Sequence, residues 1–354
     1  MIRSALVAEM ILLLALVSMV TFIGTFTPAV LSPVEACYPL SECNFLQAWD
    51  GFKSPAGIAV DPQSGNITVA DLGNNRIEEF NATGYFLTAW GCKGAYNATC
   101  PASVSPGEFS SPAGVTVDSS GLVYVADESN NRIEKFTLNG TFLITWGSAG
   151  GGAAQFNHPM GIASDNFGNV YVTDAGNNRV EKFNNTGGFV VGWGCRTANV
   201  TACSALSNGG SFTTPVGIAA DTLGNVYVTD QGNNRVEKFT DVGTFIGAFG
   251  CGVANVTSCS PGSGDGNFNN PTGISVDSSN DFYVVDSGNN RVEKFYPNGT
   301  FIGQWGAAGP ETGQFTNPGW LAINQFSGNV YVTDTGNNRV ELFGVPPLAC
   351  GIGI

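Results

Sequence analysis

Short runs of alternating apolar and polar residues fill most of the chain, and glycine and asparagine interrupt them at regular intervals. Runs such as NVYVTD at residues 225–230 have the period of two that is typical of half-buried β-strands. One unit, with enough alternating runs for four antiparallel strands, recurs along the chain. Its copies begin at Pro55, Pro112, Pro159, Pro215, Pro271 and Pro318. The pattern therefore predicts an all-β fold built from six equivalent modules.

An octapeptide after the second strand of each unit is nearly the same in all copies. It reads GNNRVEKF at residues 176–183, 232–239 and 288–295, and one or two positions differ at 73–80, 129–136 and 336–343. The repeat resembles the NHL repeat family over about residues 44–344. This resemblance implies a six-bladed β-propeller in which each unit supplies one four-stranded blade.

The two ends of the repeat region are complementary. The last unit ends at Gly344 before a fourth strand, whereas NFLQAW at residues 44–49 has the fourth-strand pattern but precedes the first unit. We expect this N-terminal strand to complete the last blade and close the ring, which leaves no long exposed strand edge. An aromatic residue occupies the same place in every fourth strand and is expected to pack between blades: Trp49, Trp90, Trp146, Trp193, Phe249 and Trp305.

Residues 1–36 differ in composition from the rest of the chain. The run from Met10 to Leu31 is almost wholly apolar and is as long as the roughly 20 residues with which a helix crosses a bilayer. We therefore predict one N-terminal apolar helix, within residues 1–36, ahead of a propeller domain at residues 37–350.

Three interpretations of this helix stay open. It is a signal peptide cut after Ala36, a retained membrane anchor, or a segment cut between Ser4 and Ala5. The last interpretation follows from a resemblance to type IV pilin-like precursors, whose mature helices pack into a filament. In that family a glutamate at the fifth mature position, here Glu9, pairs with the N-terminus of a neighbouring copy and so assists assembly.

An aspartate precedes an arginine by five residues in every unit, on either side of a tight turn. We expect the two side chains to meet between the second and third strands. A functional pair is rarely copied into every blade, so these are interpreted as structural ion pairs. The pairs are Asp71 with Arg76, Asp127 with Arg132, Asp174 with Arg179, Asp230 with Arg235, Asp286 with Arg291, and Asp334 with Arg339.

Cysteines follow the lengths of the links between units. Each long link contains two cysteines eight residues apart, and the short links contain none. Three local disulfides are therefore predicted: Cys92–Cys100, Cys195–Cys203 and Cys251–Cys259. Cys43 and Cys350 flank the strands of the closing blade, so we expect a fourth disulfide between them, with Cys37–Cys43 as the alternative. These disulfides indicate an oxidising compartment.

Eight Asn-x-Thr sequons lie at predicted turns or links, and one lies within each predicted disulfide loop. This placement favours a glycosylated extracellular surface. Strand order assigns the three loop sequons to the face with the GNNR turns and the other five to the opposite face. The predicted glycosylation sites are Asn66, Asn81, Asn97, Asn139, Asn184, Asn199, Asn255 and Asn298.

Charge and residue types exclude several classes of function. The chain has 14 basic and 28 acidic residues, and a net charge of −14 repels the phosphates of nucleic acid. Its single histidine, His158, lies in a link, so no catalytic residue, metal site or cofactor is predicted. The expected channel mouth is small or apolar, with Ala56, Ala113, Met160, Val216, Thr272 and Gly319. Repeated aspartates that could hold calcium are instead assigned to turns: Asp61, Asp118, Asp165, Asp221 and Asp277.

The sequence thus predicts a non-enzymatic extracellular propeller, anchored in the membrane by its N-terminal helix, that binds a protein or glycan ligand. Such a module should depart from six-fold regularity at one face or at the channel mouth. The alternative is a structural subunit of a cell-surface filament or coat, whose helix packs against copies of itself. A second alternative follows from the family resemblance, because some NHL-like propellers are lyases or hydrolases that hold a metal in the channel.

Overall fold

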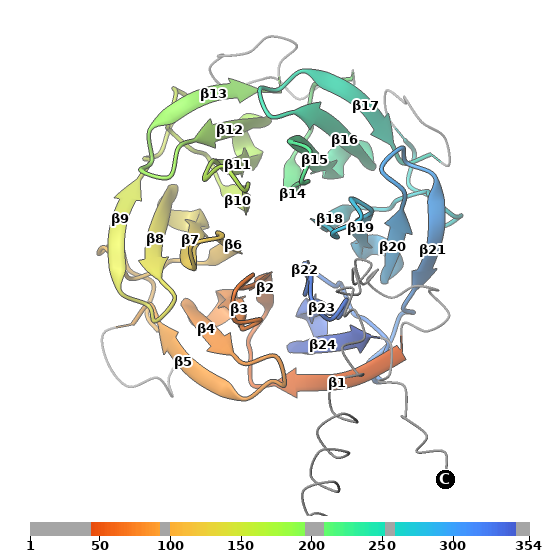
Figure 1. Cartoon of the computed structure of the whole chain (residues 1–354), viewed down its shortest axis with the longest axis horizontal. Coiled ribbons are helices and arrows are strands. Elements are labelled where there is room, and N and C mark those ends of the chain that lie inside the picture. The colour runs from red at the N-terminus through yellow and green to blue at the C-terminus, as the bar shows by residue number, and fades with distance from the viewer. Residues whose placement is uncertain (1–43, 93–99, 195–208, 252–258, 345–354) are drawn as a thin grey trace, which may run out of the picture. The chain divides into compact units, whose positions relative to one another are not determined.

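Six four-stranded antiparallel sheets surround a central axis in the computed structural model, which describes residues 44–92, 100–194, 209–251 and 259–344 (Figure 1). The sheets follow one another around the ring in the order of the sequence. Within each sheet the first strand of the repeat lies nearest the axis and the fourth lies at the circumference (Figure 1). The predicted all-β, six-bladed propeller is confirmed.

The strands of the first three blades, from the axis outward, are β2 (Pro55–Val60), β3 (Ile67–Asp71), β4 (Arg76–Phe80) and β5 (Phe86–Trp90); β6 (Pro112–Val117), β7 (Leu122–Asp127), β8 (Arg132–Thr137) and β9 (Phe142–Trp146); and β10 (Pro159–Ser164), β11 (Val170–Asp174), β12 (Arg179–Phe183) and β13 (Phe189–Trp193). The next two blades contain β14 (Pro215–Ala220), β15 (Asn225–Asp230), β16 (Arg235–Thr240) and β17 (Phe245–Phe249); and β18 (Pro271–Val276), β19 (Phe282–Asp286), β20 (Arg291–Phe295) and β21 (Phe301–Trp305).

The closing blade takes strands from both ends of the propeller. It contains β22 (Leu321–Ile323), β23 (Val330–Asp334), β24 (Arg339–Gly344) and, at the circumference, β1 (Asn44–Asp50). Strand β1 runs antiparallel to β24, from Asn44 opposite Gly344 to Asp50 opposite Arg339. The ring is therefore closed by backbone hydrogen bonds between segments almost 300 residues apart, as the complementary ends of the repeat predict.

A short 3₁₀ turn joins the second and third strands of every blade. These turns are η2 (Leu72–Asn74), η3 (Glu128–Asn130), η4 (Ala175–Asn177), η5 (Gln231–Asn233), η6 (Ser287–Asn289) and η7 (Thr335–Asn337). Because neighbouring strands are antiparallel, the 3₁₀ turns, the links between blades and the prolines that begin the innermost strands all lie at one face. The turns that follow the innermost strands lie at the opposite face.

The apolar core is divided among the junctions between blades. One cluster joins Tyr171 and Trp193 of the third blade to Val226 and Phe239 of the fourth. The ring centroids of Trp193 and Phe239 are 6.0 Å apart. In every blade the fourth-strand aromatic residue named above lies 5.6–6.0 Å from a phenylalanine of the next blade. This is the packing between blades that the sequence predicts.

The predictions for the N-terminal region concern residues outside the described part of the chain. They include the predicted helix within residues 1–36, the domain boundary at residue 37, the processing sites and Glu9. All described residues belong to one compact unit. Among them, no helix has the length and the apolar character that a membrane crossing requires.

Candidate functional site

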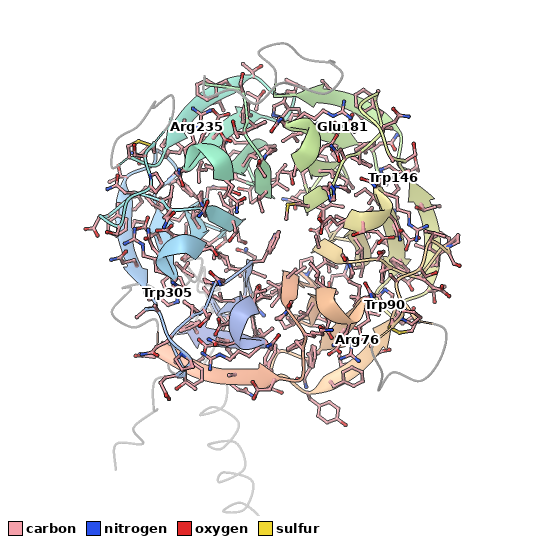
Figure 2. All side chains as sticks on the ribbon, turned by 180° about the vertical axis from the view of Figure 1, so that it is seen from behind. Arg76, Trp90, Trp146, Glu181, Arg235 and Trp305 are labelled. Carbon is pink, nitrogen blue, oxygen red and sulfur yellow. A yellow bond between two sulfur atoms is a disulfide. The ribbon has the colours of Figure 1, made fainter. Side chains whose placement is uncertain are left out.

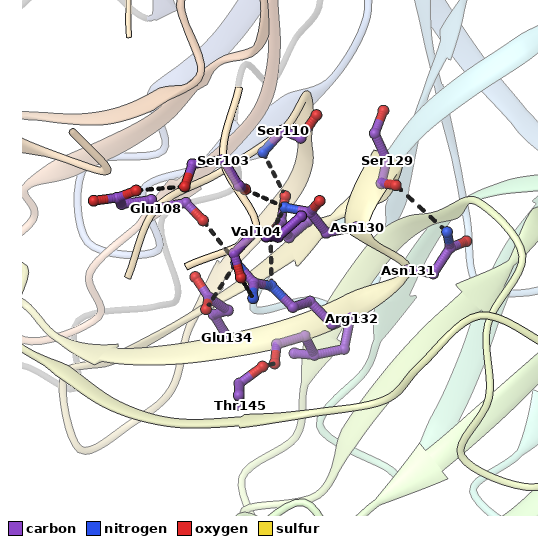
Figure 3. Close-up of polar contacts among 12 residues, drawn as sticks. Ser103, Val104, Glu108, Ser110, Ser129, Asn130, Asn131, Arg132, Glu134 and Thr145 are labelled. Atoms are coloured by element: carbon purple, nitrogen blue, oxygen red, sulfur yellow. Dashed lines mark hydrogen bonds and ion pairs between the residues drawn. The ribbon is translucent and has the colours of Figure 1, made fainter. Parts of the chain in front are cut away.

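The aspartate–arginine pairs hold the links between blades. In the second blade, Arg132 Nε donates to Asp127 Oδ2 at 2.7 Å, and Asp127 Oδ1 accepts a hydrogen bond of 2.8 Å from the Ser110 backbone. Arg132 Nη2 also donates to the carbonyl oxygens of Ser105 and Glu108, at 2.9 and 2.7 Å (Figure 3). The Asp127–Arg132 pair therefore attaches the link that precedes the second blade to that blade.

The same ion pair occurs in every blade. The Nε–Oδ2 distances lie between 2.7 and 2.9 Å, and each aspartate side chain is fully buried. Arg76, Glu181 and Arg235 lie within the body of the blades rather than along the central channel (Figure 2). These contacts support the structural role that the sequence assigns to the pairs.

A glutamate two residues after each arginine completes the cluster. Arg235 Nη2 lies 2.7 Å from Glu237 Oε1, and neither side chain is exposed to solvent. Burial outweighs the attraction of Arg235 and raises the pKa of Glu237 to about 8. Burial likewise raises the pKa of Glu293 to about 8. In the other blades it raises the pKa of the equivalent glutamate to about 7; these residues are Glu78, Glu134, Glu181 and Glu341. These perturbed carboxyls lie in the scaffold, away from the channel.

The second asparagine of each GNN turn joins its blade to the next. Asn75 is in the left-handed region, with φ of 52°, and its Oδ1 accepts a hydrogen bond of 2.8 Å from the Ser111 backbone. Asn338 forms the same bond with Ser54 across the ring closure. The remaining junctions repeat it, with Asn131 and His158, Asn178 and Thr214, Asn234 and Asn270, and Asn290 and Asn317.

Two of the predicted disulfides lie within the described residues. Cys92 is bonded to Cys100 and Cys251 to Cys259, with Cα–Cα distances of 5.4 and 5.5 Å. The Cys100 backbone also donates a hydrogen bond of 2.9 Å to Asn74 O, so this disulfide ties its link to a 3₁₀ turn. The predicted pairs Cys195–Cys203 and Cys43–Cys350, and the alternative with Cys37, lie outside the described residues.

Four predicted glycosylation sites are in the turns between third and fourth strands, and their amide oxygens hold the turn. Asn184 Oδ1, for example, accepts hydrogen bonds from the backbones of Thr186 and Gly188, at 3.0 and 2.8 Å. Asn81, Asn139 and Asn298 occupy equivalent turns. Asn66 differs because its Nδ2, the atom that would carry a glycan, donates to Glu79 at 2.8 Å. The predicted sites Asn97, Asn199 and Asn255 lie outside the described residues.

The repeated aspartates at the ends of the innermost strands form turns. Asp118 Oδ1 accepts hydrogen bonds of 2.8 and 3.0 Å from the backbones of Ser120 and Leu122, and its Oδ2 accepts one of 2.9 Å from Tyr124 OH. Equivalent bonds occur at Asp61, Asp165, Asp221 and Asp277. In the described part of the chain, no group of three histidine, cysteine or acidic residues is placed to bind a metal. His158 is 60% exposed, and its Nδ1 lies 3.1 Å from Glu128 Oε1.

A cavity opens at the channel end that lies opposite the 3₁₀ turns. Its deeper part has a volume of about 250 Å³ and is lined by the innermost strands. Its outer part, about 320 Å³, is lined by the turns that follow β10, β14, β18 and β22. Residues predicted to ring the channel mouth, such as Ala56 and Val216, lie at the other end of the same strands and line neither part. The cavity therefore opens at the end of the channel opposite these residues.

The closing blade breaks the repeat inside this cavity. The other blades carry glycine at the third position of PxG, and a β-carbon added to Gly57 would lie only 2.5 Å from the Ala113 carbonyl oxygen of the next blade. In PGW at residues 318–320, Trp320 takes that place. Trp320 donates a backbone hydrogen bond of 2.8 Å to Thr333 Oγ1, is partly buried, and lines the deeper part of the cavity.

Three exposed apolar side chains lie on turns at the face where the cavity opens. Phe167, Leu223 and Phe326 occupy equivalent positions in the turns after β10, β14 and β22, and are 83%, 74% and 70% exposed. Serine or glutamine stands at the same position in the other blades. Phe326 also lines the cavity. The molecule thus departs from six-fold regularity at one channel mouth, where it presents apolar surface to solvent.

Comparison with known proteins assigns the family. The NHL repeat matches residues 52–80, 109–136, 156–183, 212–239 and 268–295, which fall in the first five blades. The described structure adds the sixth. The chain is an NHL-repeat β-propeller.

The relatives of this NHL propeller differ in function and in length. It is 39% identical over 87 residues to peptidyl-glycine alpha-amidating monooxygenase A of Xenopus laevis, an alignment that covers 24% of this chain and 9% of the relative. It is 31% identical over 218 residues to mouse NHL repeat-containing protein 3, covering 58% and 45%. The XC5397 gluconolactonase of Xanthomonas campestris has a similar fold, with a TM-score of 0.59, 13% identity and coverage of 90% and 97%. These relatives therefore establish the fold but not an activity.

Sequence reasoning missed the residues that make this NHL propeller asymmetric. The signal was available, because a tryptophan where five units have glycine stands out once the units are aligned. Phe167, Leu223 and Phe326 can also be found in the sequence as apolar residues in predicted turns. Turn sequences are interpreted for backbone conformation, however, and the exposure of these side chains is seen only in the structure.

Proposed function

We propose that this NHL propeller is a non-enzymatic binding module, displayed outside the cell, that recognises a partner at the rim of its channel cavity. One observation carries the proposal: Trp320 lines the channel cavity, and the exposed Phe167, Leu223 and Phe326 lie on turns at the face where this cavity opens. Exposed apolar patches bordered by polar residues are typical of interaction sites. The six-fold repeated charges, in contrast, are used to hold blades and links together.

Display outside the cell is proposed from the cysteines and from the N-terminal sequence. Disulfides such as Cys92–Cys100 persist in oxidising compartments. The apolar run at residues 10–31 is proposed to anchor the propeller in the membrane. Assembly of this run with copies of itself, with Glu9 as an assembly residue, is the alternative proposal for the same segment.

The test places a photo-reactive benzoylphenylalanine at residue 326 of the protein on its native cells. We expect a cross-linked adduct of discrete mass that is lost when Trp320 is also replaced by alanine. The matched control carries the same group at Ile246, which is exposed on the outer strand β17. Equal cross-linking at both positions would contradict a site at the rim. Turnover of a lactone or of an α-hydroxyglycine peptide by the purified protein would instead support the lyase or hydrolase alternative.

A further inference from the structure

The cavity at the channel mouth has a shape and a charge that select its ligand. Both parts of the cavity open at the same end of the channel and share lining residues, among them Asp165, Ala220 and Gln325. The deeper part, about 250 Å³, has room for one long side chain, and the outer part, about 320 Å³, has room for the residues beside it.

The lining is acidic. Asp61 and Asp165 line the deeper part, Asp165, Asp221 and Asp277 line the outer part, and neither lining contains lysine, arginine or histidine. Among the described residues only Asp277 of these four has an ion-pair partner, Lys294 Nζ at 3.4 Å. A cleft lined by one sign of charge in a low-dielectric wall concentrates ligands of the opposite sign. Anionic ligands and a second copy of this chain, with its net charge of −14, are therefore disfavoured.

Aromatic side chains accompany these carboxylates, one at the floor of the cavity and one at its mouth. Trp320 directly precedes β22 and lies deep in the cavity, whereas Phe326 follows β22 and lies at the mouth. An indole face attracts a lysine ammonium or an arginine guanidinium through its quadrupole. Phe167 and Leu223 extend the apolar rim across the neighbouring turns and are more than 70% exposed.

We infer that the cavity takes the side chain of an arginine or lysine from an extended segment of a partner protein, and that apolar residues beside it pack on Phe326, Phe167 and Leu223. The basic group lies over Trp320, in the negative field of Asp61 and Asp165, whose buried carboxylates accept the turn hydrogen bonds described above. This inference rests on the proposed binding function and specifies the chemistry of the partner. The partner is therefore a basic and apolar segment, rather than an acidic peptide, a nucleic acid or a membrane surface.

The test is selection of random heptapeptides displayed on phage against the full-length protein held in mild detergent. We expect enriched peptides to contain arginine or lysine next to an aromatic or aliphatic residue. A synthetic copy of the most enriched peptide should bind at least tenfold more weakly to Trp320→Gly, which restores the residue of the other blades. Phe326→Ser should also weaken it, because serine stands at this position in two other blades. Ile246→Ser, on the outer surface, is the matched control and should leave affinity unchanged.

Two results would overturn the inference. One is enrichment of acidic or uncharged peptides, and the other is binding of the basic peptide to both rim variants with wild-type affinity. Phe326→Ser keeps this test valid if Trp320→Gly does not fold, because residue 326 lies on an exposed turn. A Trp320-dependent cross-link at residue 326, together with peptides that lack basic residues, would leave the binding function standing and reject only the basic partner. Absence of both the cross-link and any rim-dependent peptide would reject both.

Discussion

The Arg235 side chain is fully buried between two carboxylates, Asp230 at 2.8 Å and Glu237 at 2.7 Å. Its guanidinium also donates to the Ser211 carbonyl at 2.8 Å. A buried ion contributes to stability only while its partners and hydrogen bonds remain in place. The members of this arginine–carboxyl cluster thus depend on one another for their contribution to stability. Substitution of a single member should therefore lower the free energy of unfolding.

Arg235→Met leaves two carboxyl groups buried without their cation. We expect a loss of about 3–5 kcal/mol in the free energy of unfolding, which is typical when one partner of a buried pair is removed. His158→Ala is the control, because it removes a mostly exposed contact with Glu128 and should cost less than about 1 kcal/mol. Guanidinium unfolding followed by circular dichroism measures both variants. Equal losses in the free energy of unfolding would contradict a stabilising role for the buried cluster.

The buried glutamates make stability depend on pH in a defined direction. Burial raises the pKa of Glu237 to about 8, so the folded protein keeps a proton that the unfolded chain releases near its ordinary value of 4.5. The stabilising contribution is therefore complete below about pH 4.5 and is lost as the pH rises to about 8. We expect the melting temperature to fall by several degrees between pH 5 and pH 9. Glu237→Gln should flatten this fall, whereas the exposed Glu311→Gln should not.

We expect the extent of glycosylation to differ among the sequons, depending on whether the asparagine Nδ2 is engaged in a hydrogen bond. Asn184 and Asn298 use their oxygens to hold turns and are exposed, whereas Asn66 Nδ2 donates to Glu79 at 2.8 Å. In a glycosylating host, mass spectrometry of glycopeptides should find sugar at the exposed turn sites and little at Asn66. Glu79→Ala should raise occupancy at Asn66, and full occupancy of Asn66 in the unaltered protein would contradict this account.

At the scale of elements, the closing blade is the one whose fourth strand does not follow its third strand in the sequence. Its fourth strand, β1, reaches the blade from the far end of the repeat region and pairs with β24. Trp49 on β1 stacks on Phe80 of the first blade at 5.7 Å and packs on Tyr331 of its own blade at 5.6 Å. Three separate parts of the chain therefore meet around one indole ring.

Replacing Trp49 should open the ring more readily than replacing an equivalent tryptophan elsewhere. Trp49→Ala is expected to cost about 3–5 kcal/mol and to release β1 locally, because the strand that follows β1 in the sequence, β2, belongs to another blade. Trp146→Ala is the matched control within a continuous blade. Hydrogen exchange should show early exchange in β1 and β24 of the first variant only, and similar exchange patterns in both would contradict a special role for the closure.

Element-level patterns explain which features the sequence predicts. Period-two alternation and the repeated GNNR turns determine the blades, the closure by residues 44–49 and the aspartate–arginine pairs, because each depends on short-range spacing. The cavity depends on which end of the innermost strands is constricted, and that follows from contacts between blades, such as the approach of Gly57 to the Ala113 carbonyl. No repeat pattern within one unit encodes such a contact. The sequence therefore did not locate the cavity, although it did predict a departure from six-fold regularity at one face or at the channel mouth.

At the scale of the whole molecule, every junction between blades has the same construction. Each contains an apolar cluster, a fourth-strand aromatic residue and an asparagine bond such as that of Asn338 with Ser54. A closed ring has no terminal repeats, so the loss of one blade exposes the cores of both neighbours. This differs from open repeat arrays, in which the ends unfold first.

We expect the described propeller to unfold in one cooperative transition. Tryptophan fluorescence reports the junctions and far-ultraviolet circular dichroism reports the strands, so the two signals should change with the same guanidinium midpoint. The measurement is made with the disulfides intact, because reduction would change the links during unfolding. Two separated midpoints would show that the blades behave as independent units and would contradict the shared cores.

Trp320 occupies a position that is glycine in the other five blades, and this changes the symmetry that a partner encounters along the channel axis. A ring with glycine at every junction offers six identical rotational settings to anything that approaches along its axis. One tryptophan reduces them to a single setting. A partner that contacts Trp320 would consequently be held at one rotational setting relative to all the blades, and we expect one partner to bind each propeller.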